Sequence, residues 1–117
     1  MSLAKDGSTL ICKEIAEEGF SHAERLHVFI EEIIREAGIT FQDLNAIAVS
    51  QGPGSYTGLR IGVSAAKGLC YALDIPLIAI DTLQTLARQV KQTDGCIVPM
   101  IDARRMEVYS AIFDANY

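Results

Sequence analysis

NAIAVSQGPGSYTGLRIG, residues 45–62, leads from a short apolar run through a glycine-rich turn into a helical pattern. Residues 45–50 are almost wholly apolar, which predicts a strand covered on both faces. From residue 57 to residue 73 apolar positions recur at helical spacing, and Ser55 is placed to cap that helix. A buried strand followed directly by a helix is typical of layered α/β domains.

The segment before this unit predicts a hairpin and a first helix. Asp6-Gly7 favours a tight turn between a very short strand at residues 1–4 and a strand at residues 9–15. Ser21 and Glu24 form a capping box, which opens an amphipathic helix that stops before Gly38.

The segment after this unit continues the alternation of strands and helices. Residues 77–80 predict a second buried strand, and Asp81 or Thr82 can cap a helix that carries Val90 and stops near Asp94-Gly95. Two further strands are expected at residues 96–101 and 107–113. The chain is therefore predicted to be one α/β domain, residues 1–117, with a mixed sheet flanked by helices.

The glycine-rich turn departs from the known phosphate loops. A Walker loop needs a lysine and a hydroxyl residue directly after its last glycine, and no such pair occurs here. The dinucleotide pattern requires glycine at position 57, where the chain has Thr57. Two interpretations stay open: Gly52, Gly54 and Ser55 bind an anion at the helix N-terminus, or they only make a sharp turn and a cap.

The helix at residues 57–73 divides into three faces when its residues are sorted by angle. One apolar face suits the sheet, and a polar face carries Arg60, Ser64, Lys67 and Tyr71. A third face is apolar and made of small residues, which allow a second helix to approach closely. We predict that it forms a partner interface, together with one apolar residue that lies off the core stripe of the first helix: Gly58, Ile61, Ala65, Gly68, Ala72 and Val28.

Composition limits the class of protein. The formal net charge of −5 argues against a general grip on a phosphate backbone, so RNA contact is expected only through a partner. Cys12, Cys70 and Cys96 are odd in number and widely spaced, which predicts neither a disulfide framework nor a zinc site. No signal region or membrane span is visible, so a cytoplasmic protein is expected.

Other candidate chemistry is weak. His22 and His27 are five residues apart on one helix, whereas a helical metal pair uses a spacing of four. A charged cluster in the last hairpin can be an anion site or a turn with solvated charges, and the turn is favoured: Asp102, Arg104, Arg105 and Glu107. No nucleophile lies beside a base, so no catalytic or metal residue is predicted.

Four motifs resemble one known family when they are taken together and in order. They are SHAERL at residues 21–26, GPGSYTGLRIG at residues 52–62, DTLQTLA at residues 81–87 and IDARRMEVY at residues 101–109. The chain is identified by them as similar to the bacterial TsaB family, also called YeaZ, over nearly its whole length.

The resemblance implies an RNase H-like, actin-like fold and a role in making threonylcarbamoyladenosine on transfer RNA. It implies a non-catalytic subunit that binds a TsaD-like transferase paralogue, with a TsaE-like ATPase engaging the pair and a homodimer forming in isolation. ATP and metal are then expected in the partner subunits, with no cofactor in this chain. The alternative is a nucleotide-binding or glycoprotease-like enzyme.

The chain departs from the family pattern at both ends. Members begin with a strand resembling ILxIDTS, whereas this chain begins MSLAKDG, and relatives continue past Tyr117 into a second lobe. We therefore expect an N-terminal lobe that lacks the first strand and the second lobe. Without that strand, unpaired backbone groups are expected in the sheet.

Overall fold

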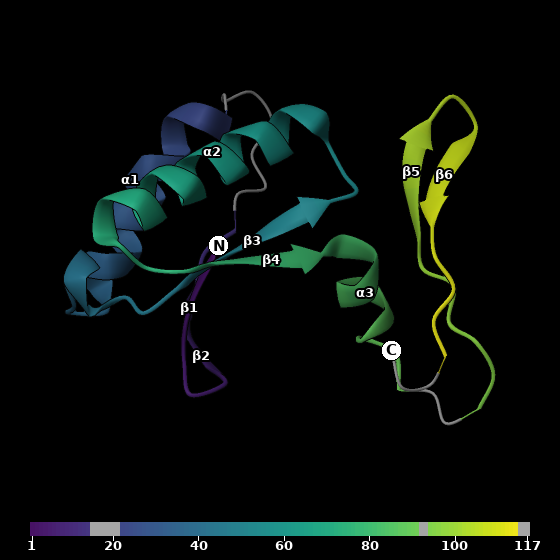
Figure 1. Cartoon of the computed structure of the whole chain (residues 1–117), viewed down its shortest axis with the longest axis horizontal. Coiled ribbons are helices and arrows are strands. Elements are labelled where there is room, and N and C mark those ends of the chain that lie inside the picture. The colour runs from purple at the N-terminus through teal and green to yellow at the C-terminus, as the bar shows by residue number, and fades with distance from the viewer. Residues whose placement is uncertain (15–21, 92–93, 115–117) are drawn as a thin grey trace.

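The structure is a computed structural model that describes residues 1–14, 22–91 and 94–114 (Figure 1). Strands and helices alternate through most of the chain, which confirms the predicted α/β class. A single 3-10 turn lies between the first helix and the third strand. The elements are β1 (Ser2–Lys5), β2 (Ser8–Cys12), α1 (His22–Glu36), the 3-10 turn (Phe41–Asp43), β3 (Ile47–Gly52), α2 (Tyr56–Leu73), β4 (Leu77–Asp81), α3 (Thr82–Ala87), β5 (Met100–Arg104) and β6 (Glu107–Ser110).

The first two strands form the predicted antiparallel hairpin. Asp6 and Gly7 have φ values of 51° and 77°, the left-handed geometry that a two-residue hairpin turn requires. The second strand ends at Cys12, earlier than the predicted residue 15, which lies outside the described residues. The N-terminal amino group of Met1 donates to the Lys13 carbonyl at 2.7 Å, so pairing continues past the end of β2.

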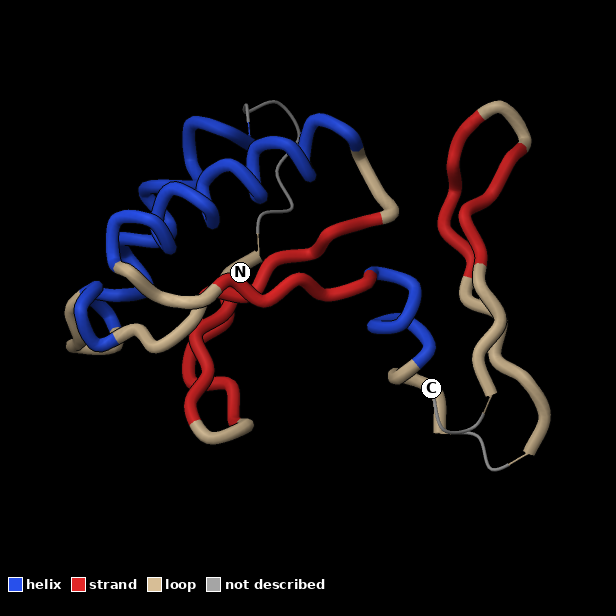
Figure 2. The backbone as a smooth tube through the Cα atoms, in the orientation of Figure 1, coloured by secondary structure: helices blue, strands red, loops and turns tan. Residues whose placement is uncertain are grey.

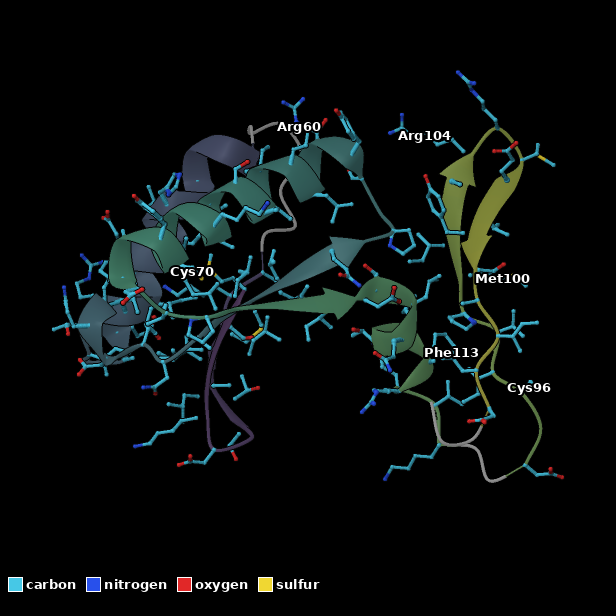
Figure 3. The ribbon with its side chains drawn as sticks, viewed as in Figure 1. Arg60, Cys70, Cys96, Met100, Arg104 and Phe113 are labelled. Atoms are coloured by element: carbon cyan, nitrogen blue, oxygen red, sulfur yellow. The ribbon has the colours of Figure 1, made fainter. Side chains whose placement is uncertain are left out.

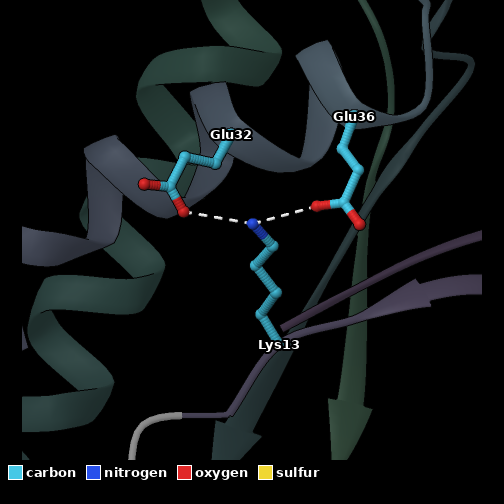
Figure 4. A network of polar contacts seen from close by, with 3 residues as sticks. All are labelled: Lys13, Glu32 and Glu36. Atoms are coloured by element: carbon cyan, nitrogen blue, oxygen red, sulfur yellow. Dashed lines mark hydrogen bonds and ion pairs between the residues drawn. The ribbon is translucent and has the colours of Figure 1, made fainter.

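Lys13 connects the end of this hairpin to α1 (Figure 4). Its Nζ lies 3.0 Å from Glu36 Oε2 and 3.1 Å from Glu32 Oε2, one helical turn apart on α1. Hydrogen bonds to Glu36 and Glu32 raise the pKa of Lys13 above its ordinary value. Because both ion pairs of Lys13 are partly exposed, they contribute little to the stability of the fold and serve mainly to orient the hairpin against α1.

Helix α1 confirms the predicted amphipathic pattern. It buries Ile33 and Ile34 and packs against α2, while its end is followed by Gly38 at a φ of 68°. The predicted cap Ser21 lies outside the described residues.

The central unit is β3, α2 and β4. The two strands are parallel, with Ile47 opposite Leu77 and Ser50 opposite Ile80, and α2 covers one of their faces. Ala66 and Cys70 are buried on α2. The prediction that both strands are covered on both faces is wrong, because Ile78 is 46% exposed and Ile80 is 41% exposed on the face away from Val49 and Ala79.

For the C-terminal third, the predicted types of element are confirmed, but their boundaries are shifted. Asp81, one of the two predicted caps, accepts a hydrogen bond from the Gln84 N–H at 2.9 Å, and α3 ends at Ala87, well before the predicted stop near Asp94-Gly95. The fifth strand begins at Met100 instead of residue 96, and an isolated antiparallel bridge joins Ile97, before β5, to Phe113, after β6. Exposed Met100 and Val108 show that this hairpin has little packing of its own.

The described strands form three separate two-stranded sheets, so the mixed sheet is not continuous. Hydrogen bonds pair β1 with β2, β3 with β4, and β5 with β6. Figure 2 shows both long helices on one side of β3 and β4, while β5 and β6 stand apart beyond α3. The surface of α2 that faces away from β3 and β4 therefore lies on one side of the molecule.

Candidate partner interface

Helix α2 is fixed at both ends and along its sheet face. Ser55 Oγ accepts a hydrogen bond from the Gly58 N–H at 3.5 Å, so the predicted cap is confirmed. At the other end Asp74 adopts a left-handed φ of 54°, and the buried Cys70 thiol donates to the Pro76 carbonyl at 3.6 Å. These contacts fix the rotation of α2 about its own axis. They therefore determine which of its side chains face solvent.

The predicted small-residue face lies on the outer part of α2 and is incompletely covered. Gly58, Gly68 and Ala72 are exposed, whereas Ile61 and Ala65 are half-buried. On the neighbouring helix α1, Val28 is 51% exposed, although it is a large apolar side chain. The five residues of α2 are called the small face from here on.

Among the described residues, no close neighbour requires glycine at the two glycine positions of the small face. A Cβ added at Gly68 would meet nothing within 4 Å, and one added at Gly58 would touch only the Ser55 side chain, at 3.7 Å. Glycine in a helix interior is less favourable than alanine by about 0.5–1 kcal/mol. Gly58 and Gly68 are both unfavourable for helix stability and have open space beside them. Such positions are expected on a surface that a helix of a second chain approaches closely.

This observation makes a prediction about the isolated chain. Gly68→Ala is expected to raise the free energy of unfolding by about 0.5–1 kcal/mol, because alanine lowers the backbone entropy cost and meets no neighbour. Urea unfolding at low protein concentration measures the effect without a contribution from association.

The matched control is Gly52→Ala. Gly52 has a φ of 105°, and an added Cβ would lie 3.2 Å from Leu59 Cδ1, so this change should destabilise the chain. A destabilising effect of Gly68→Ala would contradict the open space beside Gly68.

The glycine-rich turn forms one end of a hollow of about 350 Å³. Gly52 is buried, and its peptide bond to Pro53 is cis. Ser50 and Thr82 hold the strand ends together through a hydrogen bond of 2.6 Å between their hydroxyl oxygens. The lining includes no charged residue: it consists of Val49, Ser50, Ser55, Gly58, Leu59 and Gly62.

The lining of the hollow therefore offers no positive side chain to an anion bound at the glycine-rich turn. In addition, one N–H group of the first turn of α2, that of Gly58, already donates to Ser55. The close approach of Leu59 gives Gly52 a structural reason to be glycine. Anion binding by Gly52, Gly54 and Ser55 stays a prediction that these contacts favour less than the structural turn.

The histidines and cysteines that could bind a metal do not lie close together in the described structure. The side chain of His22 lies outside the described part of the chain, and His27 is exposed. Within residues 1–14, 22–91 and 94–114, no three His, Cys, Asp or Glu side chains gather as metal ligands would. Cys70 is buried, while Cys12 is exposed on β2 and Cys96 is exposed between α3 and β5.

The charged cluster of the last hairpin is a strained turn. Arg104, Arg105 and Met106 all have positive φ values, between 55° and 67°, and Asp102 Oδ1 accepts from the Arg104 N–H at 2.7 Å. The side chains of all four charged residues are exposed, including Glu107. The geometry fits the favoured interpretation of a turn with solvated charges.

Sequence reasoning missed one contact on α2. The Arg60 guanidinium lies 5.4 Å from the centre of the Tyr56 ring, at a distance typical of a cation–π interaction. The spacing of four residues on a helix was the available signal.

Among the described residues, no helix is long and apolar enough to cross a bilayer.

Comparisons with known proteins place these features in a family. The family model described as "TsaD: tRNA N6-adenosine threonylcarbamoyltransferase" matches residues 14–116. The tRNA threonylcarbamoyladenosine biosynthesis protein TsaB of Bacillus subtilis is 41% identical over 105 residues, which cover 90% of this chain and 46% of that protein. The chain thus spans about half the length of the curated relatives it matches.

A transferase and a solved structure are also similar. The tRNA N6-adenosine threonylcarbamoyltransferase of Bacillus thuringiensis strain Al Hakam is 51% identical over 59 residues, covering 50% of this chain and 17% of that protein. The structure of YeaZ from Pseudomonas aeruginosa superposes with a TM-score of 0.80 at 33% identity, covering 97% of this chain and 53% of that one.

Proposed function

Because this chain belongs to the TsaB (YeaZ) family, we propose that it is a non-catalytic subunit that binds and supports a TsaD-like transferase in tRNA threonylcarbamoylation. The activity of the assembly would reside in that transferase, with ATP and metal held by the partner subunits. A TsaE-like ATPase would engage the pair in the cytoplasm, and transfer RNA would reach the chain only through the complex.

The observation that carries this proposal is the open space beside Gly58 and Gly68. Each glycine weakens the helix, and no neighbour in residues 1–14, 22–91 and 94–114 requires either of them to be glycine. A partner helix that packs closely on the small face would use the space that both glycines leave.

The similarity to a transferase indicates which partner fits. Half of this chain is 51% identical to a segment of that relative, so the two proteins share part of one domain. A surface that pairs two copies of such a domain can also pair two related copies. We therefore propose that the isolated chain self-associates through α1 and α2, and that the paralogue competes for the same surface.

The first test is direct association. The whole chain is mixed with a purified TsaD-like transferase, and the mass of the complex is measured by light scattering after size exclusion. We expect a complex of one copy of each, formed at the expense of the homodimer. Failure of the two proteins to associate at micromolar concentration would contradict the proposal.

The second test addresses catalysis. Purified alone, the chain is expected neither to hydrolyse ATP nor to cleave a folded protein, since the hollow beside the glycine-rich turn has no charged lining. Turnover that is lost on a single substitution, such as Asp102→Ala, would favour the alternative of a nucleotide-binding or glycoprotease-like enzyme.

A further inference from the structure

One side of α2 carries polar and aromatic residues along most of its length. They are spaced four, four, three and four residues apart, which places them on one side of the helix over about 22 Å. All five are exposed, and Tyr71 and Tyr56 are 92% and 74% exposed. We call this set the outer stripe: Tyr56, Arg60, Ser64, Lys67 and Tyr71.

The outer stripe is positive in an acidic chain. The net charge is −5, yet α2 contains Arg60 and Lys67 and no aspartate or glutamate. Within the described part of the chain, neither Arg60 nor Lys67 has a carboxylate within ion-pair distance. The nearest carboxylate in sequence is Asp74, which follows the last turn.

The aromatic residues add a second kind of contact. Arg60 lies over the Tyr56 ring, and Figure 3 shows it projecting from α2 on the side away from β3. Tyr71 presents its ring to solvent near the opposite end of the helix. Cations interleaved with exposed rings are the combination that binds single-stranded nucleic acid, since phosphates pair with the cations and bases stack on the rings.

We propose that the outer stripe is a contact surface for an unpaired RNA strand, such as a loop of the transfer RNA. This inference rests on the proposed function, which brings transfer RNA to the complex, and adds a direct contact to it. Two cations in an acidic chain give a weak contact by themselves, so the stripe positions RNA that the assembly already holds.

The whole chain, at 12.7 kDa, allows a test by NMR titration. The probe is a short single-stranded RNA of mixed sequence, added up to about 1 mM at about 50 mM salt. We expect chemical shift changes in the Tyr56 and Tyr71 rings and in the amides around Lys67. Absence of any change, or changes confined to other surfaces, would overturn the proposal.

Substitutions separate phosphate pairing from stacking. Arg60→Ala and Lys67→Ala are each expected to reduce the slope of log affinity against log salt by about 0.7. Tyr71→Ala is expected to weaken binding by about 5- to 150-fold with little change in that slope. Lys5→Ala, which removes an exposed cation of β1, is the control and should have much less effect. Equal effects of Lys5→Ala and Lys67→Ala would overturn the proposal.

Polyglutamate distinguishes RNA from an acidic protein. If it shifts the same resonances as strongly at the same concentration of negative charge, the stripe recognises acidic protein and the RNA assignment is wrong. Association with the transferase is measured separately on Arg60→Ala and Lys67→Ala, which should keep it. A chain that binds RNA through the stripe but not the transferase would contradict only the proposed function.

Discussion

Ala65→Arg is expected to abolish both self-association and binding of the TsaD-like transferase. Ala65 is half-buried near the middle of the small face, between exposed Gly58 and exposed Ala72. An arginine there would fill the space that a partner helix needs and would bury its charge without a carboxylate. Such a change at a closely packed interface costs several kcal/mol, about 3–5 by analogy with an unpaired buried charge, or more than a hundredfold in affinity.

A second variant removes the risk that Ala65→Arg only unfolds the chain. Gly68→Arg lies on the same face, and its Cβ would meet nothing within 4 Å in the monomer. It should therefore leave the circular dichroism spectrum unchanged while it abolishes both associations. Light scattering gives the homodimer, and co-elution with the transferase gives the complex.

Lys67→Glu is the matched control for these two variants. Lys67 is exposed on the outer stripe, so reversing its charge should change either association much less than Ala65→Arg does. If both Ala65→Arg and Gly68→Arg leave both associations intact, the small face is not the interface. The glycine-rich turn would then have to be reconsidered as a ligand loop.

Local signals in the sequence predicted most of the elements. Ser55 and Asp81 cap their helices as expected, and Asp6-Gly7 adopts the left-handed turn that its composition favours. These features depend on hydrogen bonds and backbone preferences within a few residues, which sequence alone carries well. The α/β alternation follows from the same local patterns.

The coverage of the strands could not be predicted in the same way. The apolar runs at residues 45–50 and 77–80 indicate burial on two faces, but Ile78 and Ile80 remain partly exposed. Whether an apolar strand is covered depends on what packs against it, and pattern alone does not specify this. The early end of α3 and the late start of β5 are likewise boundary errors, the usual weakness of pattern reasoning.

For the site, angular sorting predicted the membership of the small face but not its surroundings. The empty space beside Gly68 and the contact between Leu59 and the Gly52 position are properties of packing between segments. They give Gly52 and Gly68 opposite roles, although both are glycines of the β3–α2 unit. Similarly, the absence of charge around the hollow became visible only when β3 and α2 were placed together.

An added first strand is expected to raise the melting temperature of this chain clearly, by about 10 °C. The pairs β1–β2 and β3–β4 share no hydrogen bonds, so each described strand of these pairs uses only one of its two backbone edges. Sheets of two strands are marginally stable. A strand that bonded to both pairs would join them into one sheet.

The size of the effect follows from what such a strand would add. A strand on the free edge of β3 would add ladder hydrogen bonds, each worth about 0.5–1.5 kcal/mol net, and would bury its own apolar side chains, at about 1.5–3 kcal/mol for each one fully buried. After the entropy cost of ordering the added residues, we expect about 2–3 kcal/mol. In a domain of this size each kcal/mol shifts the melting temperature by about 3–6 °C, so the total is near 10 °C.

The experiment adds a strand of the family type ILxIDTS before Met1 and compares melting curves. A glycine- and serine-rich extension of equal length is the control, and it should leave the melting temperature unchanged because it adds no apolar side chains to bury and favours disorder. Protection of the β3 backbone from hydrogen exchange should rise only with the first extension, since exchange reports the pairing of that strand. Equal melting temperatures for both extensions would mean that the two sheet pairs do not accept a strand between them.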